Sequence, residues 1–222
     1  MQVNVAPGAS AAAAEAAVWI ARQLRGAVHR RGEATIAVSG GRTPAAMFGA
    51  LSELDVPWAA ITVFQVDERV APDGDAARNA ALLELLPVPA SRRRTMPVTA
   101  RDLRAAARRY ASALPDRLDV VHLGLGDDGH TASWPPNDPV VGSTDLVAMS
   151  AEYRGHVRMT LTPAAVNAAR HRLVLATGAD KADPVERWLL GDPSLPVQRV
   201  RRVDTVVVLD QAAAARLPSP AR

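Results

Sequence analysis

The sequence predicts an α/β fold with a doubly wound, mostly parallel β-sheet and helices on both faces. Short apolar runs alternate with longer segments whose apolar residues recur at helical spacing. This alternation is typical of βαβ units, in which consecutive strands run parallel. Most of the apolar runs also end in a polar or glycine-rich turn. We expect residues 1–222 to form one such domain, because 48% hydrophobic residues suffice for its core.

The elements of the first half follow from periodicity and helix-end signals. The Ala-rich segment Ser10–Arg31 is amphipathic and predicts a helix with Ser10 as its N-cap. Pro44 opens the next helix, since proline is well tolerated in a first helical turn. The other predicted elements are strands over 35–38, 61–66 and 96–98, the last a weak edge strand, and helices over 44–54, 76–86 and 102–114.

The second half continues the alternation. The run Leu118–Leu123 predicts a buried strand bounded by glycine, and Pro163 predicts the start of a helix that ends near Ala169. The remaining predicted elements are strands over 145–149, 158–162, 171–177 and 204–209, and a helix over 180–190.

Four polar segments directly follow predicted strands, namely 39–44, 67–69, 124–133 and 178–181. In a doubly wound sheet, ligands bind outside the carboxyl ends of the strands. We therefore expect these four segments to meet around one functional site.

The most informative of the four is the glycine-rich loop Gly124-Leu-Gly-Asp-Asp-Gly-His-Thr-Ala-Ser133. Its glycines match the G-x-G-x-x-G dinucleotide pattern, but that pattern requires an electropositive loop followed by a helix. This loop instead carries Asp127 and Asp128, and the nearby Pro135-Pro136 cannot continue a helix. We interpret it as a catalytic loop that holds two carboxylates close to His130.

Composition excludes several classes of function. Cysteine is absent, which excludes disulfides, thiolate nucleophiles and Cys-ligated zinc. The formal net charge is only +3 and aromatic residues are 4%, so the basic clusters at 91–94 and 199–202 are interpreted as solvated surface. No apolar stretch has the length of a membrane span, and no signal peptide is recognisable. We expect no nucleic-acid or membrane partner and a cytoplasmic location.

Five motifs of this chain occur together, in this order, in one known family. They are Ser39-Gly-Gly-Arg-Thr-Pro44, Asp67-Glu-Arg69 with Asn79 downstream, the glycine-rich loop, Arg158-Met-Thr-Leu-Thr162 with Asn167-Ala-Ala-Arg170, and Gly178-Ala-Asp-Lys181. Over about residues 10–215, the chain resembles the 6-phosphogluconolactonases, in a larger group that includes glucosamine-6-phosphate deaminase. The resemblance implies a Rossmann-like fold of the sugar-phosphate isomerase type.

The resemblance also implies an activity, the hydrolysis of 6-phospho-D-glucono-1,5-lactone to 6-phospho-D-gluconate in the oxidative pentose phosphate pathway. It implies no metal and no organic cofactor. The expected partner is therefore the small sugar-phosphate lactone itself. For the assembly, we expect a monomer or a small homo-oligomer.

The loop residues support this chemistry independently of the resemblance. Lactone hydrolysis needs a base that activates water, stabilisation of an oxyanion, and a proton for the departing ring oxygen. His130 is the predicted base, since an imidazole commonly titrates near neutral pH. Asp128 is predicted to orient it or to bind sugar hydroxyls, with stabilisation of the turn as the alternative. By resemblance, Asp67 and Arg69 act at the reacting end, whereas Glu68 is expected only to pair with an arginine.

A phosphate group needs N–H donors and cations. Gly40 and Gly41 can bring backbone amides close to it, and by resemblance Arg158 and Lys181 face the same pocket. Lys181 is the one lysine among the 26 basic residues, which indicates either a need for a compact ammonium or chance retention. An ion pair is the alternative for Arg158, and solvent exposure is the alternative for Arg42. The predicted phosphate-binding residues are Ser39, Gly40, Gly41, Arg42, Thr43, Arg158 and Lys181.

The chain departs from the family pattern at Ala77-Arg78, where we do not carry over the family's side-chain contacts. It also departs at Trp134-Pro-Pro136, which we expect to reshape the pocket lip. Three other functions remain as alternatives. An amino-sugar-phosphate deaminase or isomerase places a glutamate soon after the histidine, and Thr131–Asp138 contains none. A non-catalytic sugar-phosphate sensor would keep the phosphate ligands and lose the base. A nucleic-acid-binding protein would bind with steep salt dependence.

Overall fold

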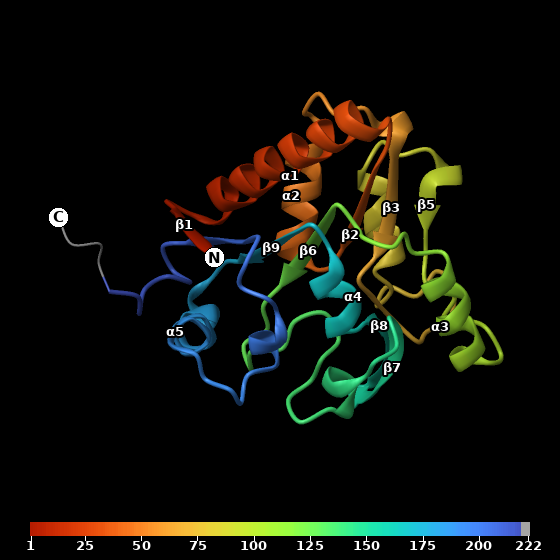
Figure 1. The fold of residues 1–222 in the computed structure, drawn as a ribbon. Coiled ribbons are helices and arrows are strands. Elements are labelled where there is room, and N and C mark those ends of the chain that lie inside the picture. The colour runs from red at the N-terminus through yellow and green to blue at the C-terminus, as the bar shows by residue number, and fades with distance from the viewer. Residues whose placement is uncertain (219–222) are drawn as a thin grey trace.

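A seven-stranded parallel sheet forms the centre of the structure, a computed structural model that describes residues 1–218 (Figure 1). The strand order is β1-β10-β9-β6-β2-β3-β5. The predicted fold class is therefore confirmed. In chain order, these strands are β1 (Gln2–Ala6), β2 (Ala34–Val38), β3 (Ile61–Gln65), β5 (Arg93–Arg94), β6 (Val120–Gly124), β9 (His171–Ala176) and β10 (Thr205–Asp210).

Helices cover both faces of this sheet. Helices α1 (Ala9–Arg31) and α2 (Arg42–Ser52) pack on one face, and the other face carries α3 (Leu103–Ser112), α4 (Pro163–Ala168) and α5 (Ala182–Leu190) (Figure 1). Two hydrophobic clusters fill the two interfaces. Val121 and Leu123 of β6 enter one cluster while Val120 enters the other, so burial on both faces explains the uninterrupted apolar runs.

A second sheet lies on the α3 side and runs antiparallel, in the order β4-β8-β7. It consists of β4 (Asp67–Arg69), β7 (Val147–Tyr153) and β8 (His156–Leu161). The predicted strands at 145–149 and 158–162 therefore exist but do not extend the parallel sheet. Val66 joins the two sheets, because its N–H donates to Val38 (2.9 Å) and its carbonyl accepts from Leu161 (2.7 Å). This switch carries Asp67–Arg69 across the carboxyl end of the main sheet.

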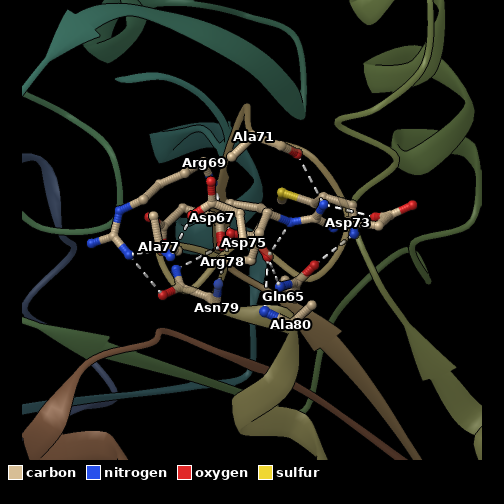
Figure 2. A network of polar contacts seen from close by, with 12 residues as sticks. Gln65, Asp67, Arg69, Ala71, Asp73, Asp75, Ala77, Arg78, Asn79 and Ala80 are labelled. Carbon is tan, nitrogen blue, oxygen red and sulfur yellow. Dashed lines mark hydrogen bonds and ion pairs between the residues drawn. The ribbon is translucent and has the colours of Figure 1, made fainter. Parts of the chain in front are cut away.

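The predicted helix over 76–86 is wrong, since only a 3₁₀ helix forms there, over Ala80–Leu85. At its start, backbone groups bond to the side chains of Glu68 and Arg69 from β4. The buried Glu68 carboxylate accepts the N–H groups of Asn79 and Ala80, both at 2.8 Å. The Arg69 guanidinium donates a hydrogen bond to the carbonyl of Ala77 (Figure 2). Tertiary hydrogen bonds thus outweigh the helical periodicity of this segment.

Two other predictions fail at the edges of the fold. No strand forms over 96–98, because the Met96 N–H donates to Gln65 Oε1 (2.6 Å) and the short edge strand is Arg93–Arg94. Ser10 is not a cap, since α1 begins at Ala9 with Gly8 before it and no side-chain cap. The sequence analysis also missed β1, which pairs with β10.

The other helix and strand predictions are correct within a few residues of the observed ends. Further 3₁₀ helices lie at Trp58–Ala60, Ala90–Arg92, Pro139–Gly142, Ala179–Lys181 and Pro196–Arg199. Among the described residues, no helix is long and apolar enough to cross a bilayer.

The strand order determines where along the sheet a ligand-binding crevice forms. From β2 the chain proceeds outward through β3 to β5, and it then returns to β6 on the other side of β2. The loops after β2 and β6 therefore diverge from adjacent strands. Such a topological switch point leaves a crevice at the carboxyl edge of the sheet.

Candidate active site

A cavity of about 330 Å³ opens at this crevice. All four polar segments that the sequence places after strands contribute to its wall, namely 39–44, 67–69, 124–133 and 178–181. Each predicted site residue lines it except Asp128, which lies directly behind His130. The volume suits a small polar metabolite.

The loop after β6 is folded tightly around its glycines. A Cβ atom on Gly126 would lie 1.9 Å from His130 Nδ1, so only glycine lets the imidazole fold back over this backbone. Gly129 has φ +80°, and its carbonyl accepts the N–H of Val197 (3.1 Å). A hydrogen bond from the Gly126 N–H to the His130 carbonyl (2.7 Å) closes the turn. No helix follows, which agrees with rejecting the dinucleotide motif.

Asp128 and His130 form a hydrogen-bonded pair. The Nδ1 atom of His130 lies 2.5 Å from Asp128 Oδ1, which also accepts the His130 backbone N–H (3.1 Å). The other carboxylate oxygen accepts the hydroxyl of Tyr153 at 2.6 Å. With Nδ1 held by the carboxylate, His130 Nε2 is the nitrogen left for a ligand in the cavity.

The Asp128 carboxyl is held in its ionised form. Partial burial opposes ionisation, but the hydrogen bonds from His130 and Tyr153 together outweigh it, and the pKa of Asp128 lies well below its usual range. The ionised Asp128 carboxylate accepts a hydrogen bond from Nδ1–H and fixes the tautomer with a free Nε2. The pair therefore has the geometry of a general base with its orienting group.

Asp67 enters the cavity from β4. Ser133 Oγ donates to its carboxylate at 2.7 Å, and the side chain is almost completely buried. Burial raises the pKa of Asp67 above its usual value, against the opposing effect of Ser133 and of the arginines Arg69 and Arg158. Ser133 was not among the predicted site residues, although it ends the glycine-rich loop.

Glu68 and Arg69 point in opposite directions, as successive residues of a strand do. Glu68 lies buried beneath the site and pairs with Arg78 at 3.2 Å, as expected from the sequence. Arg69 reaches the cavity, where Nη1 also contacts Asn79 Oδ1 at 3.4 Å (Figure 2). Asn79 in turn packs against Gly40 so closely that a Cβ atom added to this glycine would lie 2.1 Å from Asn79 Oδ1. The buried network thus fixes Arg69 relative to the 39–44 loop.

Among residues 1–218, five cationic side chains surround the cavity and only two carboxylates line it, Asp67 and Asp180. Lys181 pairs with Asp180 at 2.9 Å, and the hydroxyls of Thr43 and Thr177 lie 2.9 Å apart across the loops after β2 and β9. Both segments stand at the carboxyl ends of parallel strands, where an anion is favoured. The five cations are Arg42, Arg69, Arg154, Arg158 and Lys181.

Of the two departures from the family pattern, only the Trp134-Pro-Pro136 run contributes a residue to the cavity wall. Arg78 pairs with Glu68 and Asp73 beneath the site. Trp134 is fully buried and donates from Nε1 to the Leu161 carbonyl at 2.7 Å. The expected change of the pocket lip stays a prediction. Of that run, Pro135 lines the cavity.

Sequence reasoning missed Tyr153 and Arg154, which reach the cavity from the turn between β7 and β8. Neither residue belongs to a glycine-rich or strand-end motif. The left-handed backbone of Arg154 (φ 49°) and Gly155 (φ 80°) marks a tight hairpin turn, but no sequence signal tells which loop the hairpin approaches.

One group of side chains has the spacing of metal ligands. Atoms of Asp127, Asp128 and His130 lie within 4.8 Å of one another. All three are already engaged, since Asp127 pairs with Arg154 and the other two pair with each other. These contacts explain the cluster without a metal.

Comparison with known proteins identifies the family. The family model described as glucosamine-6-phosphate isomerases/6-phosphogluconolactonase matches residues 7–209. The chain belongs to this family. The resemblance to this family is thereby confirmed.

Two members of the family illustrate the similarity in sequence. A 6-phosphogluconolactonase of Pseudomonas aeruginosa is 38% identical over 179 residues, which cover 74% of this chain and 75% of that protein. A 6-phosphogluconolactonase of Mycobacterium tuberculosis is 32% identical and is matched over 98% of both chains.

Solved structures agree on the fold. A 6-phosphogluconolactonase from Shewanella baltica superposes with a TM-score of 0.86 at 29% identity, over 95% of this chain and 97% of that one. A monomeric glucosamine-6-phosphate deaminase superposes with a TM-score of 0.85 at 19% identity, over 97% and 99% of the chains. Fold alone therefore does not separate the two activities within the family.

Proposed function

We propose that this protein hydrolyses 6-phospho-D-glucono-1,5-lactone to 6-phospho-D-gluconate, a reaction of the oxidative pentose phosphate pathway. The observation that carries the proposal is the Asp128–His130 pair, with Nδ1 held at 2.5 Å by the carboxylate and Nε2 left for a ligand in a cationic cavity. Curated relatives named 6-phosphogluconolactonase support the same activity.

At the reacting end, His130 Nε2 takes a proton from water while the water oxygen bonds to C1 of the lactone. The resulting oxyanion develops near Arg69, whose guanidinium is fixed by Ala77 and Asn79. Collapse of the tetrahedral intermediate breaks the bond between C1 and the ring oxygen. That oxygen takes the proton back from the His130 imidazolium and becomes a hydroxyl. Asp67 accepts hydrogen bonds from sugar hydroxyls on the β4 side.

At the other end, the phosphate is bound by cations and backbone amides. Lys181 and the loop Ser39, Gly40, Gly41, Arg42 and Thr43 come from neighbouring strand ends, and Arg158 adds a buried charge. Burial lowers the pKa of Arg158, but the group remains a cation at neutral pH because its starting value is so high. A dianionic phosphate balances the excess of positive charge around the cavity.

The deaminase alternative has less support from the site. Ring opening of an amino sugar requires a second proton-transfer group soon after the histidine. Between Thr131 and Asn137 the chain has no carboxylate, and the first one is Asp138. Asp138 caps the backbone N–H groups of Val140 (2.8 Å) and Ala151 (2.9 Å) and does not line the cavity. A hydrolase needs no such group.

The direct test is lactone hydrolysis, with the lactone generated in situ and 6-phosphogluconate detected by a coupled dehydrogenase. Wild type and His130→Ala are compared after subtraction of spontaneous ring opening. We expect activity in the wild type and a loss of at least 10²-fold in the variant. Full activity in the variant would refute His130 as the base. A wild type no faster than background would refute the lactonase assignment and favour a deaminase or a sugar-phosphate sensor.

The remaining proposals concern the setting of the enzyme. We propose that residues 1–222 act as one α/β domain in the cytoplasm, of which the structure describes 1–218. We propose a monomer or a small homo-oligomer that needs neither metal nor organic cofactor, because every catalytic role above falls to a side chain. Size-exclusion chromatography with light scattering, and activity after treatment with chelator, test these points.

A further inference from the structure

Tyr153 contacts both members of the Asp128–His130 pair. It ends β7, in the antiparallel sheet, 25 residues after Asp128 in the chain. Its hydroxyl lies 2.6 Å from Asp128 Oδ2 but 3.5 Å from His130 Nδ1. The hydroxyl therefore donates to the carboxylate and leaves Nδ1 to the other oxygen.

The Tyr153 ring has a second set of contacts. Its edge meets the His130 imidazole, with centroids 5.4 Å apart at 66°. The guanidinium carbons of Arg154 and Arg158 lie 5.1 and 5.3 Å from the ring centroid, within the range of cation–π attraction. The Tyr153 carbonyl also accepts from Arg158 Nη1 at 2.6 Å. One residue thus contacts the base, its carboxylate and a proposed phosphate ligand.

We propose that Tyr153 is a positioning residue that orients the Asp128–His130 pair through its hydroxyl and holds Arg158 through its ring and carbonyl. This proposal rests on the function of His130 proposed above. The hydroxyl fixes the carboxylate plane so that Oδ1 faces Nδ1, which in turn directs Nε2 into the cavity. It also withdraws charge from Asp128 and so limits how strongly the carboxylate stabilises the imidazolium.

The phenol is suited to this role over the working pH range. Burial and the hydrogen bond to Asp128 raise the pKa of Tyr153 to about 12, so it remains a donor. Other charged groups close to the pair also influence a titration of His130. They are Asp127 on the glycine-rich loop, Arg154 and Arg158 on the hairpin, Asp67 and Arg69 on β4, and Lys181 after β9. A test must therefore change the hydroxyl and leave these charges in place.

Tyr153→Phe does so, because it removes only the hydroxyl and keeps the ring against Arg158. Without the donor, Asp128 stabilises the imidazolium more strongly, so we expect the imidazole of the variant to titrate at higher pH than that of the wild type. The acid limb of the kcat/KM profile should move upward with it, while KM changes less than about twofold. Tyr153→Leu removes the ring as well and should raise KM by about tenfold through the freed Arg158.

The readout that does not depend on activity is the imidazole ¹⁵N spectrum of His130, which reports both tautomer and pKa. Its signals are identified by their loss in His130→Gln. Tyr110→Phe is the matched control, since its hydroxyl bonds to Gln65 and Arg94 in the core, away from the pair. That variant should leave the His130 titration unchanged.

An unchanged His130 titration and tautomer in Tyr153→Phe would overturn the proposal. An equal rise of KM in the Phe and Leu variants would overturn the role assigned to the ring. If the His130 titration shifts as expected but the wild type shows no lactonase activity, the positioning role stands and the proposed function fails.

Discussion

His122 gives a prediction whose size follows directly from the structure. It lies fully buried in β6 with Phe48 at 6.3 Å, and among the described residues neither ring nitrogen has a hydrogen-bond partner. Burial lowers the pKa of His122 from 6.5 to about 3, so the fold holds it neutral. The unfolded chain binds a proton below pH 6.5 that the native state does not. Stability therefore falls as the pH drops from 6.5 toward 3.

Each pH unit in this window costs about 1.4 kcal/mol. Between pH 7 and pH 4.5, His122 should therefore lower the free energy of unfolding by about 2.5 kcal/mol. His122→Leu removes this contribution and conserves volume, and it should change stability at pH 7 by less than about 1.5 kcal/mol. The gap between the wild-type and variant curves should widen steadily as the solution becomes more acidic.

The assay is denaturant unfolding followed by tryptophan fluorescence at several pH values between 4.5 and 7. Carboxylates contribute their own pH dependence, but they are common to both proteins and cancel in the difference. His29→Gln is the control, because His29 is exposed on α1 and its loss should not change the slope. Parallel curves for wild type and His122→Leu would refute the reasoning that a buried, neutral imidazole opposes acid stability.

The other predictions concern the site. Asp128→Asn should lower kcat by about 10²- to 10⁴-fold with KM nearly unchanged, because an amide can fix the wrong tautomer of His130; unchanged steady-state kinetics would contradict this. Lys181→Ala should raise KM for the lactone about 10- to 100-fold and lower kcat far less, and an unchanged KM would exclude Lys181 as a phosphate ligand. Gly126→Ala should lower kcat while the protein stays folded by circular dichroism, because the added Cβ displaces the imidazole; full activity would show that the loop adapts. Glu68→Ala should cost about 3–5 kcal/mol in denaturant unfolding, because Arg78 loses one partner and the N–H groups of Asn79 and Ala80 lose their buried acceptor, and a loss below 1 kcal/mol would contradict a buried network.

Much of this molecule could be predicted from local sequence. The apolar runs of β2, β3, β6, β9 and β10 identify strands covered on both faces, because only such strands exclude polar residues from both sides. Parallel strands then bring their carboxyl ends to one edge. The four polar segments therefore meet at one cavity, as predicted.

The glycine-rich loop was also predictable in its main feature. Asp128 and His130 are two residues apart, so a tight turn brings their side chains together whatever the rest of the chain does. The closeness of Gly126 to the imidazole follows from the same turn. The rejection of a dinucleotide site needed only the charges and prolines in this segment.

Other features depend on partners distant in the chain. The segment 76–86 has helical periodicity, but the N–H of Asn79 donates to the buried carboxylate of Glu68, 11 residues earlier in the chain, and so the helix does not form. Tyr153 reaches Asp128 only because the chain leaves the parallel sheet at Val66 and builds β4, β8 and β7 beside the cavity. The sequence by itself determined the parallel sheet, its ligand-binding edge and the catalytic loop, since these depend on local patterns. Only the tertiary structure decided which side chains support that loop, because their hydrogen bonds join segments that no local pattern connects.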